Sequence, residues 1–138
     1  IDTTTANDTE SYVAGLWHHD RVGNRLKAFV FLHDVDCDEG HPTEVAVGSH
    51  LLNYYRTDAM GASRFADEYV RNNYEVAKLC GPKGGGFVVD THTLHRGAVE
   101  GSLARTVAVG EYHAVGKCAA MDALKLGLPC PSGDQFLV

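Results

Sequence analysis

The chain has 138 residues, of which 44% are hydrophobic and 22% are charged, a composition typical of an ordinary globular domain with one core. Its formal net charge of −6 argues against a nucleic-acid-binding surface, which would carry a basic stripe. No apolar run approaches the length needed to cross a membrane, so we expect neither nucleic acid nor membrane as a partner.

The four cysteines, Cys37, Cys80, Cys118 and Cys130, form no CxxC pair, which argues against a zinc knuckle. A pair of disulfides is the open alternative, but free thiols in a reducing compartment are the simpler interpretation. The corresponding expectation is an intracellular, cytoplasmic location. No secretory signal is visible at the N-terminus, but the chain begins with Ile1 and not with methionine, as expected of a processed form or a fragment.

In the first half of the chain, short apolar stretches alternate with polar turns, a pattern typical of strands. After a polar arm over residues 1–10, a strand is predicted over 11–17 and leads into His18. The clearest strand covers residues 26–32. The acidic turn that follows lacks the spacing of an EF-hand calcium loop, so we interpret it as solvated. Another short strand is predicted over 43–47.

In the second half, apolar residues recur at helical spacing between residues 62 and 70, which predicts an amphipathic helix of about three turns. The glycine-rich segment 81–86 is predicted to be a turn, because no helix follows it and no phosphate-binding GK[ST] ending is present. The other predicted elements are strands over 74–80, 87–90 and 105–113, a short helix over 117–126 and a tail over 127–138. About seven short strands with one inserted helix favour a β-sandwich or jelly roll.

Two histidines and an aspartate stand where predicted strands end. His18 and Asp20 are two residues apart, so on an extended chain their side chains point to the same face. His95 lies in the polar turn after strand 87–90, and Arg105 follows ten residues later at the head of an apolar run. Two imidazoles and one carboxylate on one face of an iron ion leave its other positions open for cosubstrate and oxygen. A turn-capping His18 and a satisfied core His95 are the alternative, because eight histidines produce HxD pairs by chance.

The order and separations of these pieces resemble the catalytic core of the phytanoyl-CoA dioxygenase family of iron(II)- and 2-oxoglutarate-dependent oxygenases. The matching segments are WHHD from Trp17, LKAFVFLHDVDCDEG from Leu26, GSH from Gly48, FVVDTHTLHRG from Phe87 and the strand from Arg105. They span about residues 17–113. The resemblance implies a double-stranded β-helix, a cupin-like jelly roll with one inserted helix and with iron between its two sheets.

The resemblance also implies roles for individual residues. The family's metal ligands fall on His18, Asp20 and His95. Its distal histidine matches His95 rather than His92, and the arginine that holds the far carboxylate of 2-oxoglutarate matches Arg105. Phe29 loosely matches an apolar wall beside the cosubstrate. The implied cofactor is Fe(II), the cosubstrate is 2-oxoglutarate, and the partners are O2 and a small organic substrate. The implied reaction is hydroxylation with release of succinate and CO2, and no catalytic residue beyond the ligands is implied.

Some features depart from the family pattern. Val47 stands where the family usually has proline before the GSH segment, and the family's N-terminal region before the HxD strand is missing. We therefore expect residues 1–138 to be a single oxygenase core lacking its N-terminal part. Asp20 stands where related halogenases have a small residue, which favours hydroxylation.

Two other classes of protein remain as hypotheses: a cupin-like metal-binding protein without oxygenase activity, and an inactive relative. Arg105 argues against the cupin-like class, which has no need of a buried arginine ten residues after its last ligand. For Arg105 itself, a salt bridge to Asp90 or Glu111 is the structural alternative to cosubstrate binding.

Overall fold

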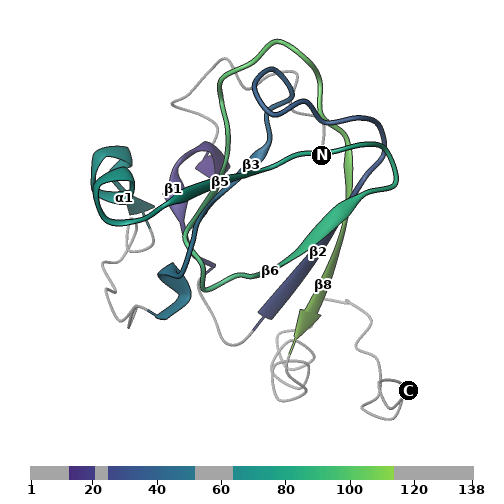
Figure 1. Cartoon of the computed structure of the whole chain (residues 1–138). Coiled ribbons are helices and arrows are strands. Elements are labelled where there is room, and N and C mark those ends of the chain that lie inside the picture. The colour runs from purple at the N-terminus through teal and green to yellow at the C-terminus, as the bar shows by residue number, and fades with distance from the viewer. Residues whose placement is uncertain (1–12, 21–24, 52–63, 114–138) are drawn as a thin grey trace.

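The computed structural model describes residues 13–20, 25–51 and 64–113; the arm predicted at 1–10, the helix at 117–126 and the tail at 127–138 lie outside these ranges. The regular structure of the described residues consists of two antiparallel sheets, one helix, α1 (Asp67–Asn73), and two short 3-10 turns (Figure 1). This arrangement confirms the predicted mainly β class and is consistent with a β-sandwich. Among the described residues, no helix is long and apolar enough to cross a membrane.

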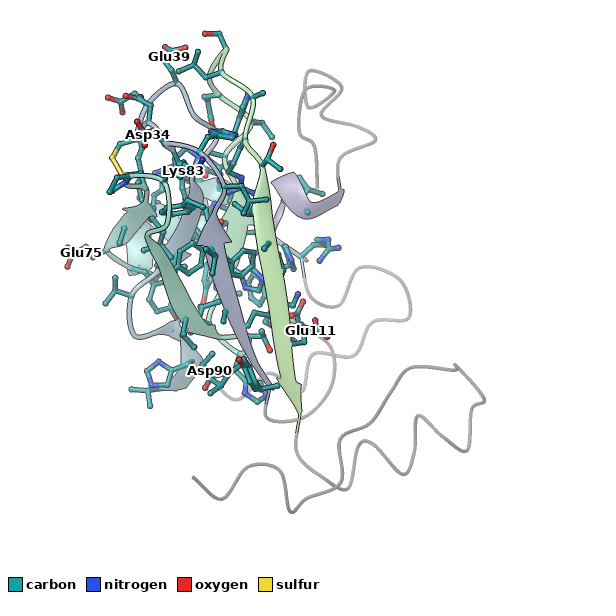
Figure 2. The ribbon with its side chains drawn as sticks, turned by 90° about the vertical axis from the view of Figure 1, so that its right-hand side faces the viewer. Asp34, Glu39, Glu75, Lys83, Asp90 and Glu111 are labelled. Carbon is teal, nitrogen blue, oxygen red and sulfur yellow. A yellow bond between two sulfur atoms is a disulfide. The ribbon has the colours of Figure 1, made fainter. Side chains whose placement is uncertain are left out.

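The larger sheet has five strands in the order β4-β1-β7-β3-β5. They are β1 (Trp17–His18), β3 (Thr43–Ala46), β4 (Arg64–Phe65), β5 (Val76–Leu79) and β7 (His95–Gly97). The smaller sheet has the order β6-β2-β8, with β2 (Arg25–Phe31), β6 (Gly86–Asp90) and β8 (Val107–His113). Two 3-10 turns, η1 (Val13–Gly15) and η2 (Ser49–Leu51), lie beside the larger sheet's strands in sequence. In Figure 2, Asp90 and Glu111 lie at one end of the smaller sheet, and Asp34 and Lys83 lie toward the other.

The five strands predicted from apolar runs after residue 25 are confirmed, with ends displaced by at most two residues. Short apolar runs bounded by turn residues are a local property of the chain, and this is why sequence alone locates these strands. The glycine-rich turn between β5 and β6 is confirmed as well, and it needs glycine at Gly84, whose φ is 81°.

Three local predictions were wrong. Residues 11 and 12 of the strand expected over 11–17 lie outside the described ranges; of the rest, Val13–Gly15 form a 3-10 turn and the strand is limited to Trp17 and His18. The helix expected from residue 62 begins only at Asp67, because Phe65 pairs with Trp17 in the larger sheet. The helical spacing arose because a strand residue and helix residues face one core. The third correction is that His95 begins strand β7 and does not lie in a turn.

Cys37 and Cys80 form a disulfide, which corrects the expectation of free thiols for these two residues; Cys118 and Cys130 lie outside the described residues. Their Cα atoms are 5.2 Å apart, within the usual range for a disulfide. Beside them, Val35 and Gly81 exchange two backbone hydrogen bonds of 2.8 and 3.0 Å, which bring the two segments into register. The cysteines are 43 residues apart, so their pairing depends on this long-range contact and not on any local spacing.

Both faces of the larger sheet are covered. One apolar cluster between the two sheets comprises Phe31, Val35 and Val107, with Phe29, Cys80 and Phe87 packed against them. A second cluster comprises Trp17, Ala46, Val70 and Leu94, with Phe65, Tyr74 and Val76 at its edge. Val70 belongs to α1, so this second cluster lies between the larger sheet and the helix. Successive side chains along a strand of the larger sheet therefore point alternately to its two faces. The face toward the smaller sheet is here called the inner face, and the face toward α1 is here called the outer face.

Candidate metal centre

Strand pairing in the larger sheet places His18 and His95 next to each other. His18 of β1 pairs with His95 of β7, and His95 pairs with Val45 of β3. Paired residues of neighbouring strands present their side chains on the same face of a sheet. The ring centroids of His18 and His95 are 4.4 Å apart. The register between β1 and β7 therefore brings together two imidazoles whose residues are 77 positions apart in the chain.

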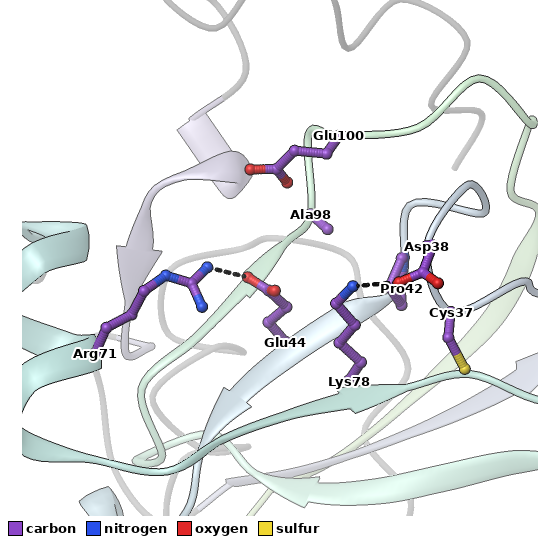
Figure 3. A pocket seen from close by; sticks show the side chains of 8 residues that line it. All are labelled: Cys37, Asp38, Pro42, Glu44, Arg71, Lys78, Ala98 and Glu100. Atoms are coloured by element: carbon purple, nitrogen blue, oxygen red, sulfur yellow. Dashed lines mark hydrogen bonds and ion pairs between the residues drawn. The ribbon is translucent and has the colours of Figure 1, made fainter.

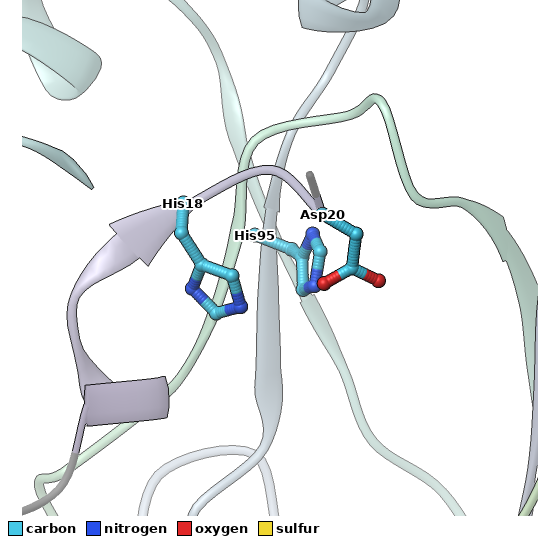
Figure 4. Close-up of side chains that lie close together, drawn as sticks. All are labelled: His18, Asp20 and His95. Carbon is cyan, nitrogen blue, oxygen red and sulfur yellow. The ribbon is translucent and has the colours of Figure 1, made fainter. Parts of the chain in front are cut away.

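Asp20 completes the group. Its backbone N–H donates a 2.9 Å hydrogen bond to the carbonyl oxygen of Thr91, which ties the end of β1 to the turn before β7. The potential ligand atoms of His18, Asp20 and His95 all lie within 4.8 Å of one another (Figure 4). The structure thus brings together the three predicted ligand residues in a group that can hold a metal ion.

Hydrogen bonds orient both imidazoles. Nδ1 of His18 is 2.7 Å from the carbonyl oxygen of Leu16, and Nδ1 of His95 is 2.8 Å from that of Thr93. A carbonyl oxygen only accepts hydrogen bonds, so each Nδ1 carries the proton and donates. Each Nε2 then has a lone pair, the arrangement found in metal-binding histidines whose other nitrogen is bound to a backbone carbonyl.

The local environment favours neutral imidazole at His18. Burial, followed by the nearby His95, lowers the pKa of His18 from 6.5 to about 4, against smaller opposing effects of Leu16 and Asp20. A ligand histidine must be neutral to coordinate a metal. Two imidazoles and one carboxylate match the donor set of non-haem iron sites, so these residues fit a divalent iron ion.

Two neighbouring histidines have other contacts. The backbone N–H of His92 donates a 2.9 Å hydrogen bond to Oδ1 of Asp90, and Nδ1 of His92 is 3.3 Å from the same oxygen. His19 is buried, with Nδ1 3.1 Å from the carbonyl oxygen of Asp20 and its ring centroid 6.1 Å from that of Phe65. Within the described ranges, neither His92 nor His19 belongs to the His–Asp–His group.

The GSH segment supports the backbone beside His95. The buried Ser49 hydroxyl accepts a 2.8 Å hydrogen bond from the N–H of Leu94 and donates one of 2.7 Å to the carbonyl oxygen of Ala46. The N–H of Val47, at the position where the resemblance implies proline, donates to the carbonyl oxygen of Glu75 at 2.9 Å. Proline has no such donor, so the departure at Val47 adds a backbone hydrogen bond.

Lys27 contacts the group and was missed by sequence reasoning. Its Nζ atom, on β2 of the smaller sheet, is 2.9 Å from Oδ2 of Asp20 and 3.5 Å from Oε1 of Glu111. The signal was present in the strand, because Lys27, Phe29 and Phe31 follow one another at every second position and therefore share a face. A lysine on the core-facing side of a strand needs a carboxylate, and here Asp20 provides it.

Arg105, the predicted cosubstrate anchor, is buried, and its Nη1 donates a 2.9 Å hydrogen bond to the hydroxyl of Thr43. Thr43 lies two residues before Val45 on β3, so its side chain shares the face of Val45 and His95 at about 7 Å along the strand. Arg105 therefore contacts the inner face that carries the histidines. The two acids considered as its alternative partners have contacts of their own: Glu111 with Lys27, and Asp90 with His92.

Phe29, the predicted apolar wall, stacks on Phe87 with ring centroids 4.6 Å apart.

A cavity of about 240 Å³ lies on the outer face of the larger sheet (Figure 3). It is lined by Cys37, Asp38, Pro42, Glu44, Arg71, Lys78, Ala98 and Glu100. Glu44 alternates with Thr43 and Val45 along β3, so the sheet separates this cavity from the His–Asp–His group.

Comparison with protein-family models and with curated proteins found no match for this chain. A function for the chain is therefore inferred from its fold class and from the geometry of the His–Asp–His group.

Proposed function

We propose that this chain is an Fe(II)- and 2-oxoglutarate-dependent dioxygenase with a double-stranded β-helix fold, similar to the phytanoyl-CoA dioxygenase family. It hydroxylates a small organic substrate and releases succinate and CO2. The observation that carries the proposal is the His18–Asp20–His95 group, with ligand atoms within 4.8 Å of one another and both Nδ1 atoms bound to backbone carbonyls. Such a two-histidine, one-carboxylate set is typical of non-haem iron oxygenases.

Three side chains are the proposed ligands of the iron ion. Nε2 of His18, Nε2 of His95 and the carboxylate of Asp20 would hold Fe(II). The bound iron would supply the redox chemistry that couples the oxidative decarboxylation of 2-oxoglutarate by dioxygen to the oxidation of a substrate C–H bond. Lys27 orients the Asp20 carboxylate from the opposite sheet through its 2.9 Å contact. Because Asp20 supplies the carboxylate that halogenases replace by a small residue, the proposed outcome is hydroxylation.

Arg105 is the proposed anchor for the distal carboxylate of 2-oxoglutarate. Its planar guanidinium matches a carboxylate with two parallel hydrogen bonds, and the hydroxyl of Thr43 fixes its orientation. The stacked rings of Phe29 and Phe87 form an apolar surface of the smaller sheet. Such a surface helps to exclude water from a reaction between the sheets.

The deciding experiment is an anaerobic titration of the protein with Fe(II) and then 2-oxoglutarate, followed by visible absorption. We expect a saturable charge-transfer band at one iron per chain, and no band in His95→Ala. Metal uptake without a 2-oxoglutarate-dependent band would indicate a cupin-like metal protein, and no metal uptake would indicate an inactive relative. Where the band forms, succinate release upon admission of oxygen then reports which small molecules are substrates.

A further inference from the structure

A second polar cluster lies directly behind the candidate metal ligands. Trp17 immediately precedes His18, and Arg96 immediately follows His95, so strand alternation turns both side chains to the outer face. Both are buried, with 1% of Trp17 and 8% of Arg96 exposed. The two residues that adjoin the candidate ligands are therefore both buried on the outer face.

These two side chains contact each other and share one acid. The guanidinium carbon of Arg96 lies 5.2 Å from the centroid of the Trp17 ring, within cation–π range. Nε1 of Trp17 donates a 2.8 Å hydrogen bond to Oδ1 of Asp67, and Nη1 of Arg96 lies 3.5 Å from the same oxygen. Asp67 is the first residue of α1, so the helix bridges the backs of β1 and β7.

A second acid fixes Arg96 to the neighbouring strand. Nε of Arg96 donates a 2.6 Å hydrogen bond to Oε2 of Glu44, the residue that it opposes in the β3–β7 pairing. Arg71 of α1 closes the arrangement, with contacts of 3.4 Å to Glu44 and 2.8 Å to Asp67. Trp17, Arg96, Asp67 and Glu44, here called the clamp, thus join β1, β3, β7 and α1.

The backbone alone gives β1 little hold on β7. The two strands share a single register pair, His18 with His95. Strand β1 is only two residues long. Within the β1–β7 ladder, this one residue pair therefore sets the separation of two imidazoles whose ring centroids are 4.4 Å apart. Side-chain contacts on the outer face supply the missing constraint, because they hold the residues adjoining both histidines.

We propose that the clamp sets the separation and orientation of His18 and His95, and that Arg96 is a positioning residue for metal binding. The inference rests on the proposed metal-binding function of these histidines. The guanidinium plane matters because it meets the indole, Asp67 and Glu44 at once, whereas a lysine ammonium is a compact charge on a flexible stem.

The test compares Arg96→Lys and Asp67→Ala with Lys78→Met as a matched control. Lys78 opposes Glu44 on the outer face, but its ion pair, 2.7 Å to Asp38, involves neither β1 nor β7. Co(II) alone is the probe, because its visible spectrum reports coordination geometry. We expect Arg96→Lys to weaken Co(II) binding roughly tenfold, the lower end of the effect of losing a group that orients metal ligands. The Co(II) spectrum should change as well, because the separation and orientation of the two imidazoles would change. Asp67→Ala should change the Co(II) affinity and the Co(II) spectrum in the same direction as Arg96→Lys. Lys78→Met should leave the affinity and the spectrum unchanged.

A metal-free measurement keeps the clamp testable apart from the proposed function. The Asp20 amide, bound to the carbonyl oxygen of Thr91, reports whether the end of β1 stays in place. Its hydrogen exchange in the metal-free protein should accelerate by roughly tenfold in Arg96→Lys and remain unchanged in Lys78→Met.

The possible results separate the two proposals. If the unmodified protein takes up no Co(II), the metal-binding function fails and the exchange of the Asp20 amide alone decides on the clamp. If Co(II) binds, wild-type affinity and spectrum in folded Arg96→Lys and Asp67→Ala overturn the clamp, even where exchange is faster. Should Arg96→Lys fail to fold, Asp67→Ala carries the test, because the Asp67 side chain is 48% exposed.

Discussion

The outer face of the five-stranded sheet joins buried Arg96 to buried Glu44, whereas its inner face places two imidazoles against each other beside one carboxylate. Both faces belong to the same short strands, and single-residue alternation decides which side chain goes where. On the outer face, opposite charges satisfy one another, which is the requirement for burying them. On the inner face, burial and a second imidazole lower the pKa of His18 to about 4, which favours the neutral ring that a metal ligand requires. The difference distinguishes a network that holds the sheet together from a group that can accept a cation.

The largest expected effect follows from removing one inner-face donor. His95→Ala should abolish Fe(II) binding, because two ligands cannot replace the three-donor face. His92→Ala is the matched control and should retain most of the binding, since the His92 ring lies beside Asp90. Anaerobic equilibrium dialysis with iron quantification measures both. Iron binding that survives in His95→Ala and fails in His92→Ala would show that the distal ligand is assigned to the wrong histidine.

The next effect concerns the inner-face arginine. Arg105→Lys keeps the charge and loses the planar fork, so the apparent affinity for 2-oxoglutarate should fall roughly tenfold or more, in keeping with about 1.5–3 kcal/mol for an ionic hydrogen bond. The charge-transfer band at increasing 2-oxoglutarate measures this, and Fe(II) affinity serves as the control because it should stay normal. Unchanged 2-oxoglutarate affinity in a folded, iron-loaded variant would remove Arg105 from the site.

A smaller effect tests whether the inner face depends on a charge from the opposite sheet. Lys27→Met removes the cation 2.9 Å from Asp20, whose side chain is only 13% exposed. The free energy of unfolding of the metal-free protein should fall by about 1–2 kcal/mol, because a nearly buried carboxylate loses the cation that lies against it. Urea denaturation with and without Mn(II) measures this. The loss should shrink with Mn(II) bound, since the ion then balances Asp20, and an equal loss in both states would contradict the assigned role.

The smallest effect is expected at an exposed outer-face pair. Lys78→Met breaks the contact with Asp38, whose side chain is 83% exposed. Exposed ion pairs contribute little, so neither the unfolding midpoint in urea nor Fe(II) binding should change measurably. A loss of stability comparable to that of Lys27→Met would mean that this exposed outer-face ion pair contributes as much to stability as the nearly buried inner-face pair, contrary to the difference proposed between the two faces.

The sequence by itself determined the strands after residue 25 and the three residues of the candidate centre. Periodic burial and a two-residue spacing are local properties of an extended chain, which is why Leu26 to Leu32 and the pair His18 and Asp20 could be recognised without a structure. The alternation of Lys27 with Phe29 also marked the inward-facing lysine, although not the acid that it contacts.

Only the tertiary structure decided which distant segments meet. Cys37 joins Cys80 through the Val35–Gly81 bridge, Phe65 leaves the helical pattern to pair with Trp17, and His95 enters a strand beside His18. The bond of Arg105 to Thr43 and the clamp behind the histidines have the same origin. Each of these contacts depends on the register between strands that are far apart in the chain, and register arises from the packing of whole sheets rather than from the spacing of residues within one segment.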